Sequence, residues 1–145
     1  MIKKTIYTSG AIEFSKDPLT WRNQLVRALC KTYTVINPKE VFCPYTKSET
    51  EYKDFIFKSC VIPDMEFVMK CDYFFVKIDK NNITYASGTW GELSLAAYLN
   101  KHIVYYLDDV KEEEISGWVL GCLTKAIKVN SIKDAIDLYK QLATK

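Results

Sequence analysis

Histidine is almost absent from this sequence, and its cysteines are scattered. His102 is the only histidine, and none of the five cysteines forms a Cys-x-x-Cys pair. Structural zinc sites are built from closely spaced cysteines and histidines, so the sequence gives no support to a zinc site. We expect neither a metal nor an organic cofactor. Cys30, Cys71 and Cys122 adjoin apolar residues, which favours buried free thiols in a reducing compartment.

Long apolar runs and blocks of one charge are also missing. No stretch approaches the roughly 20 apolar residues of a transmembrane helix, and the apolar stretch within residues 1–7 is too short for a signal peptide. We therefore expect a cytoplasmic protein that does not contact a membrane. The 20 basic and 18 acidic residues give a net charge of +2 without a sustained basic block. Nucleic acid polymers are accordingly not expected as partners.

Strand and helix patterns alternate along the 145 residues, and no Pro/Ser-rich linker or internal repeat divides them. Strands are predicted at Ile6–Thr8, Thr34–Ile36, Asp72–Ile78, His102–Tyr106 and Ala126–Val129. Helices are predicted from about Asp17 to Lys31, Glu51 to Lys70 with a pause near Pro63, Thr89 to Leu99, Ile115 to Leu123, and Ser131 to Ala143. Residues 1–145 are therefore predicted to form a single α/β domain. Its sheet should be doubly wound, mostly parallel and five-stranded.

In sheets of this kind, ligands bind beyond the carboxyl ends of the strands. The run Ser87-Gly88-Thr89-Trp90-Gly91-Glu92 enters a helix just after the loop that follows the strongest strand signal. Gly88 permits a sharp turn, and the first helical N–H groups can hold an anion. Glu92 is predicted in that first turn, where the helix dipole favours the ionised form and suits a carboxylate nucleophile. Helix capping by Gly88 or Thr89 is the alternative, and the residues alone leave both roles open.

Three further candidates for contacts with a ligand lie at the end of the first predicted strand. Ser9 and Gly10 could present a hydroxyl and backbone N–H groups, while the ring of Tyr7 could stack on a base. A plain strand-ending turn explains the pair Ser9-Gly10 equally well.

Acidic and aromatic candidates lie farther along the chain. Asp64 precedes the third predicted strand, where its carboxylate could reach a sugar hydroxyl, and Asp79 ends that strand at the predicted crevice. Trp90 lies beside Glu92 and could line a base pocket or anchor its helix to the sheet.

In their order along the chain, several motifs resemble those of the nucleoside 2-deoxyribosyltransferase-like superfamily. The similar segments are Ile6–Gly10, Val35–Pro38, Asp64 with Cys71-Asp72, Ser87–Glu92 followed by Ala96, Gly117–Gly121 and Val129–Ser131. The resemblance implies a flavodoxin-like, usually dimeric protein that cleaves or exchanges the N-glycosidic bond of a nucleoside or nucleotide. It also implies that Glu92 attacks the anomeric carbon and forms a glycosyl-enzyme intermediate, as the carboxylate does in retaining glycosidases.

The chain departs from the superfamily pattern at two positions. Ala86 stands where an acidic residue often precedes the glutamate, so we assign the proton donor for the leaving base to Asp79 instead. Ala11 replaces a proline after the first-strand glycine. Relatives that act on 5′-monophosphates use serines near these loops to bind phosphate, which implies that role for Ser9 and Ser87.

Three functions remain open on the sequence: glycosyl transfer or hydrolysis, nucleotide binding without turnover, and a structural or partner-binding domain. We further expect a homodimer. On the predicted Glu92 helix, Leu93, Ala96 and Ala97 form one apolar stripe, and Leu95 and Leu99 extend a second. One stripe suffices for packing on the chain's own sheet, so the second stripe needs a partner. Burial of that stripe under the C-terminal helix of the same chain is the alternative.

Overall fold

A twisted parallel sheet forms the centre of the computed structural model, which describes residues 2–12, 15–38, 49–85 and 88–145. The five strands are ordered β2-β1-β3-β4-β5, and every neighbouring pair is parallel. Their bounds are Thr5–Ser9 for β1, Thr34–Ile36 for β2, Tyr73–Ile78 for β3, His102–Leu107 for β4 and Ile127–Val129 for β5. This order is the flavodoxin-like arrangement. The predicted fold class is therefore confirmed, with strand boundaries that differ by a residue or so.

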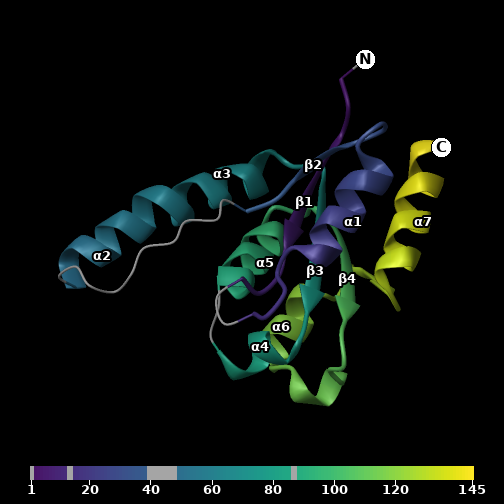
Figure 1. Cartoon of the computed structure of the whole chain (residues 1–145). Coiled ribbons are helices and arrows are strands. Elements are labelled where there is room, and N and C mark those ends of the chain that lie inside the picture. Colours follow the sequence, from purple (N-terminus) through teal and green to yellow (C-terminus); the bar gives the residue numbers. More distant parts are fainter. Residues whose placement is uncertain (1, 13–14, 39–48, 86–87) are drawn as a thin grey trace.

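Helices cover both faces of the sheet (Figure 1). Their bounds are α1 Thr20–Leu29, α2 Glu49–Ile56, the π-helix η1 Phe57–Val61, α3 Ile62–Lys70, α4 Lys80–Thr84, α5 Gly88–Tyr98, the 3₁₀-helix η2 Glu112–Glu114, α6 Gly117–Cys122 and α7 Ile132–Ala143. Helices α1 and α7 lie on one face, and α5 and α6 lie on the other. Helix α2, η1 and α3 run on from one another as an arm that leads away from the sheet.

Two hydrophobic cores result, one on each face. Alternate residues of the central strand β3 point to opposite sides, so Phe74 and Val76 enter the core beneath α3, α5 and α6. Tyr73 and Phe75 enter the core beneath α1 and α7. Because β3 is covered on both faces, its sequence is apolar along almost its whole length.

The polar segment after β3 contains a helix that the sequence analysis did not predict. Asp79 caps α4: its side chain accepts bonds from the backbone N–H groups of Asn81 and Asn82, and its own N–H donates to the side-chain oxygen of Asn82. A five-residue helix is too short to show an apolar periodicity, and this one is marked in the sequence only by its capping box.

Two other helix predictions need correction. The pause predicted near Pro63 is not a break, because η1 joins α2 directly to α3, and Pro63 lies in the first turn of α3. Helix α5 begins at Gly88, so Glu92 is its fifth residue and lies beyond the first turn.

Of the three thiols predicted to be buried, only Cys71 is fully buried. Cys122 is half-buried, and Cys30 is exposed because it lies at the C-terminal end of α1, one residue beyond the last buried position, Leu29. All three are free. Within the described ranges, no helix has both the length and the apolar character needed to cross a bilayer.

Candidate active site

Glu92 is a carboxylate buried inside the protein, and its side chain is only 6% exposed. Helix α5 carries it against the sheet through its fully buried neighbours Leu93 and Ala96. Tyr7 and Ser9 of β1 both donate hydrogen bonds to this carboxylate: the Tyr7 hydroxyl to Oε2, and the Ser9 hydroxyl to Oε1 at 2.8 Å. The two donors are two residues apart on one strand, so they face the same side of the sheet.

The position of Tyr7 corrects one sequence-based expectation. Its ring is fully buried and stacks on Phe74, with 5.8 Å between the ring centroids. A ring packed in this core is not presented to a base, so Tyr7 acts on the site only through its hydroxyl. Burial, followed by the nearby Glu92 carboxylate, raises the pKa of Tyr7 far above its usual value, and the hydroxyl therefore remains a proton-bearing donor.

Burial and four nearby groups determine the electrostatic state of Glu92. Burial raises its pKa to about 7 from an ordinary 4.5. The bonds from Tyr7 and Ser9 oppose this rise because they stabilise the carboxylate, the Asp64 charge adds to it, and the Arg22 guanidinium opposes it. The dipole-favoured ionisation predicted from the sequence is thus outweighed by desolvation. Glu92 also lies one turn into α5, where the effect of the helix end has faded.

Asp64 belongs to the surroundings of Glu92. It lies in the first turn of α3, directly after Pro63, and its side chain is half-buried. Its negative charge raises the pKa of both Glu92 and Tyr7. Helices α3 and α5 pack against each other beside β1. The structure therefore brings together four of the predicted site residues: Tyr7, Ser9, Asp64 and Glu92.

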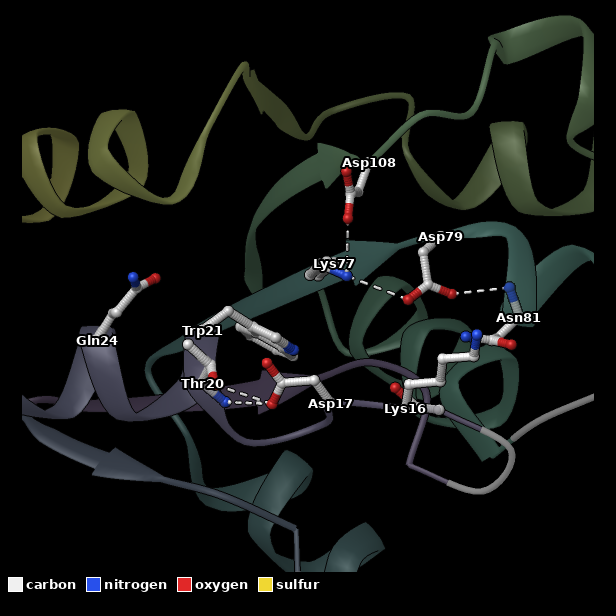
Figure 2. A pocket seen from close by; sticks show the side chains of 10 residues that line it. Lys16, Asp17, Thr20, Trp21, Gln24, Lys77, Asp79, Asn81 and Asp108 are labelled. Atoms are coloured by element: carbon white, nitrogen blue, oxygen red, sulfur yellow. Dashed lines mark hydrogen bonds and ion pairs between the residues drawn. The ribbon is translucent and has the colours of Figure 1, made fainter.

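Asp79 lies in a different setting. Besides capping α4, its carboxylate forms an ion pair with Lys77 at 3.1 Å, and Lys77 pairs with Asp108 at the same distance. These residues line a cavity of about 430 Å³ together with Asp17 and Trp21 (Figure 2). Among the described residues, Glu92 and its two hydroxyl donors are not part of that lining. The Asp79 carboxylate is therefore engaged in holding the end of β3 and the start of α4.

Of the two glycines predicted at the site, the packing requires only Gly10. A Cβ atom at Gly10 would lie 2.8 Å from the Trp21 ring and 3.2 Å from the Lys77 carbonyl oxygen, so the chain passes too close to its neighbours for any side chain. At Gly88 a Cβ atom would meet nothing within 4 Å, and its φ is not positive, so neither space nor conformation requires glycine there.

The remaining predicted residues lie around the start of α5. Thr89 is buried, and its hydroxyl accepts a bond from the Asn82 amide at 3.2 Å. Trp90 is half-buried and packs against the core on the α5 face, as expected for a ring that anchors its helix. Ser87 lies outside the described residues.

Two buried polar residues near the site, Asn82 and Arg22, were not singled out in the sequence. Asn82 follows Asp79 at the spacing of a capping box, which is a usable signal. Arg22 precedes Leu25 and Leu29 by three and seven positions, so helical periodicity places it on the buried face of α1. Across residues 2–12, 15–38, 49–85 and 88–145, no group of three His, Cys, Asp or Glu side chains is placed to hold a metal ion.

No protein-family model and no curated protein sequence matches this chain, whereas solved structures do. A conserved protein from Enterococcus faecalis V583 has a TM-score of 0.70 at 17% identity, with 97% of this chain and 99% of that one covered. The 2-deoxyribosyltransferase of Bacillus psychrosaccharolyticus has a TM-score of 0.64 at 20% identity, covering 92% of this chain and 90% of the enzyme. The CMP N-glycosidase of Clostridium botulinum has a TM-score of 0.57 at 16% identity, covering 94% and 99%. The fold is thus shared over nearly the full length of each chain.

Proposed function

We propose that this protein cleaves or exchanges the N-glycosidic bond of a nucleoside or nucleoside 5′-monophosphate, with Glu92 as the nucleophile. One observation carries the proposal: a buried carboxylate, held by the Tyr7 and Ser9 hydroxyls, lies beside the β1 end of a flavodoxin-like sheet. Two of the structural neighbours, the 2-deoxyribosyltransferase and the CMP N-glycosidase, are named for this chemistry, and their fold is the fold of this chain.

In the proposed reaction, an oxygen of ionised Glu92 attacks the anomeric carbon of the sugar. The carbon–nitrogen bond breaks, its electron pair leaves with the base, and the base takes up a proton. The sugar remains as an ester on Glu92 until water or a second base attacks the same carbon, gives up a proton to the group that protonated the leaving base, and frees the carboxylate. Tyr7 and Ser9 hold the carboxylate in one orientation, so little reorganisation is needed as its charge is lost and regained.

The proton for the leaving base needs a donor, and the site offers Asp64. Its charge acts directly on Glu92 and Tyr7, whereas the Asp79 carboxylate is occupied by Lys77 and by the start of α4. We therefore assign the proton transfer to Asp64 in place of Asp79. Asp64 of α3 would then supply the proton that the superfamily pattern assigns to an acidic residue at the position of Ala86.

A second function, nucleotide binding without turnover, is favoured by the pKa of about 7 for Glu92. Burial favours the protonated form of Glu92, and a protonated carboxyl can donate a hydrogen bond to a sugar hydroxyl. In that case, Glu92 would hold the sugar and would not attack it.

The decisive experiment is incubation with a panel of nucleosides and 5′-monophosphates, with and without an acceptor base, and chromatography of the released base. Wild-type protein should release base, and Glu92→Gln should lower the rate by several orders of magnitude because the nucleophilic charge is lost at nearly constant size. Glu113→Gln, which changes an exposed carboxylate in η2, is the matched control and should retain the wild-type rate.

The other outcomes are equally informative. Near-normal turnover by Glu92→Gln would contradict the nucleophile assignment. If neither protein releases base and both bind a nucleotide, measured by calorimetry, the binding function replaces the enzymatic one.

A further inference from the structure

The largest fully buried side chain in the described chain is a charged one, Arg22 of α1, which is 1% exposed. A guanidinium stays protonated even inside a protein, so Arg22 brings a permanent positive charge into the interior. Removing such a charge from water is costly. A buried arginine is therefore stable only where hydrogen bonds and neighbouring charges offset this cost.

Both amino groups of Arg22 bind backbone carbonyls. Nη1 donates to the Pro18 oxygen at 2.6 Å, and Nη2 donates to the Gly10 oxygen at 3.0 Å. These two carbonyls lie near the two ends of the connection between β1 and α1. The planar, two-sided donor geometry of a guanidinium suits this bridging contact, and an ammonium group does not reproduce it.

Trp21 reinforces the same contact. The Arg22 guanidinium lies 4.4 Å from the centre of the Trp21 ring, at cation–π distance. The other edge of that ring closes on Gly10, where a Cβ atom would approach to 2.8 Å. Gly10 is thus held by a hydrogen bond from Arg22 and by contact with the Trp21 ring.

Gly10 follows Ser9 directly, so the bond to the Gly10 carbonyl restrains the backbone one residue beyond the Ser9 side chain. That side chain donates to Glu92 at 2.8 Å. The groups that act on Glu92 come from three elements: Tyr7 and Ser9 from β1, Asp64 from α3 and Arg22 from α1. Arg22 is the positive charge among them. It lowers the pKa of Glu92, whereas burial and Asp64 raise it.

We propose that Arg22 is a positioning residue of the Glu92 site, which locks the turn after β1 so that Ser9 remains on the carboxylate and which supplies a fixed positive charge to that carboxylate. This inference rests on the proposed role of Glu92 as the nucleophile. It deepens that role by assigning a task to a side chain that is too deeply buried to contact a substrate.

The test compares Arg22→Met, which removes the charge, with Arg22→Lys, which keeps the charge and loses the two-carbonyl bridge. Arg27→Met changes an exposed arginine on the same helix and is the matched control. Circular dichroism establishes folding. Glu92 titration is followed by ¹³C NMR of glutamate-labelled protein, with the Glu92→Gln spectrum identifying the Glu92 signal, and it reports on Glu92 whether or not the protein turns over any substrate.

In folded Arg22→Met, the Glu92 titration should move upward, because the positive charge that lowers the pKa of Glu92 has been removed. The acidic limb of the kcat/KM profile should move with it. In Arg22→Lys, kcat should fall about tenfold or more at nearly unchanged KM. The Glu92 titration should change less in this variant than in Arg22→Met. Arg27→Met should match the wild type in every measurement.

An unchanged Glu92 titration in folded Arg22→Met would overturn the electrostatic part of the proposal, even if activity fell. If Arg22→Met does not fold, Arg22→Lys decides: wild-type kcat together with wild-type Glu92 titration would overturn the whole proposal. Should wild-type protein release no base at all, the proposed function fails, and the NMR titrations still decide whether Arg22 acts on Glu92.

Discussion

Two opposing demands meet at Glu92, because a nucleophile must be ionised and a buried carboxylate resists ionisation. The native pKa of about 7 lies above the ordinary 4.5, so between these values the folded protein holds a proton that the unfolded chain has released. Folding stability therefore falls as pH rises through this interval. The loss of folding free energy caused by ionising Glu92 is absent below about pH 4.5 and complete above about pH 7.

Replacing Glu92 with glutamine should therefore stabilise the protein in a pH-dependent manner. At about pH 8, Glu92→Gln should be more stable than the wild type by on the order of 1–3 kcal/mol, and the difference should shrink toward zero near pH 4.5. Urea unfolding at both pH values measures it, with Glu113→Gln as a control that should show no such trend. An identical difference at both pH values would show that the native pKa of Glu92 is not raised.

At Ser9 the structure changes the expected effect of a mutation. The resemblance implied a phosphate contact, which would make Ser9→Ala weaken monophosphates more than nucleosides. The hydroxyl instead donates to Glu92, so we expect Ser9→Ala to lower kcat about tenfold or more for both substrate classes, the effect of losing a bond to a charged group. Thr8→Val is the control, because Thr8 bonds to Asn37 at 2.6 Å on the other face of the sheet. A loss confined to monophosphates would restore the phosphate assignment.

At the scale of elements, local patterns specify most of the fold. Strand β3 is predictable because Tyr73–Ile78 is nearly continuously apolar, and α7 because Ser131 begins it as an N-cap whose hydroxyl accepts the Asp134 N–H. Helix α4 is not predicted because it is only five residues long and its one sequence signal is a capping box. Helix α5 begins at Gly88, a residue earlier than predicted.

Asn82 links α4 to α5, and we expect it to stabilise the start of α5. Its amide donates to Thr89 and its side-chain oxygen accepts from the Asp79 N–H, all at a fully buried position. Asn82→Ala should lower the free energy of unfolding by about 1–3 kcal/mol, the range for buried groups left without a partner. Chemical denaturation measures this loss. Asn81→Ala, at the less buried adjacent position, is the control, and equal losses for both variants would contradict a specific role for Asn82.

At the scale of the whole molecule, the sequence specifies which residues lie at the edge of the sheet and leaves their mutual contacts open. Alternating strands and helices predict the flavodoxin-like order, and that order brings Tyr7, Ser9 and Glu92 to one region. The bonds themselves span 85 and 83 residues of sequence. Nothing local in the sequence indicates that Tyr7 packs its ring on Phe74, or that burial outweighs the helix dipole at Glu92, since both depend on tertiary packing.

Association of two chains is the remaining prediction at this scale. The alternative partner for the second stripe of α5, the C-terminal helix, is wrong, because α7 packs with α1 on the opposite face of the sheet. Helix α6 packs against α5 instead, with Trp118 donating to Ser94 at 3.1 Å. Tyr98 lies one turn beyond Ser94, so two exposed rings, Tyr98 at 86% and Trp118 at 74%, share one face.

Aromatic rings are enriched at protein interfaces, and a two-fold dimer is the commonest way to cover such a face. We therefore expect light scattering at micromolar concentration to give about twice 16.8 kDa. Changing both rings, Tyr98→Ser with Trp118→Ser, should shift the mass toward the monomer. Ile2→Ser removes a 97% exposed apolar side chain elsewhere and should leave the mass unchanged. A monomer with full turnover would rule out the dimer as a requirement for activity, and a dimer that survives the double change would place the interface on another surface.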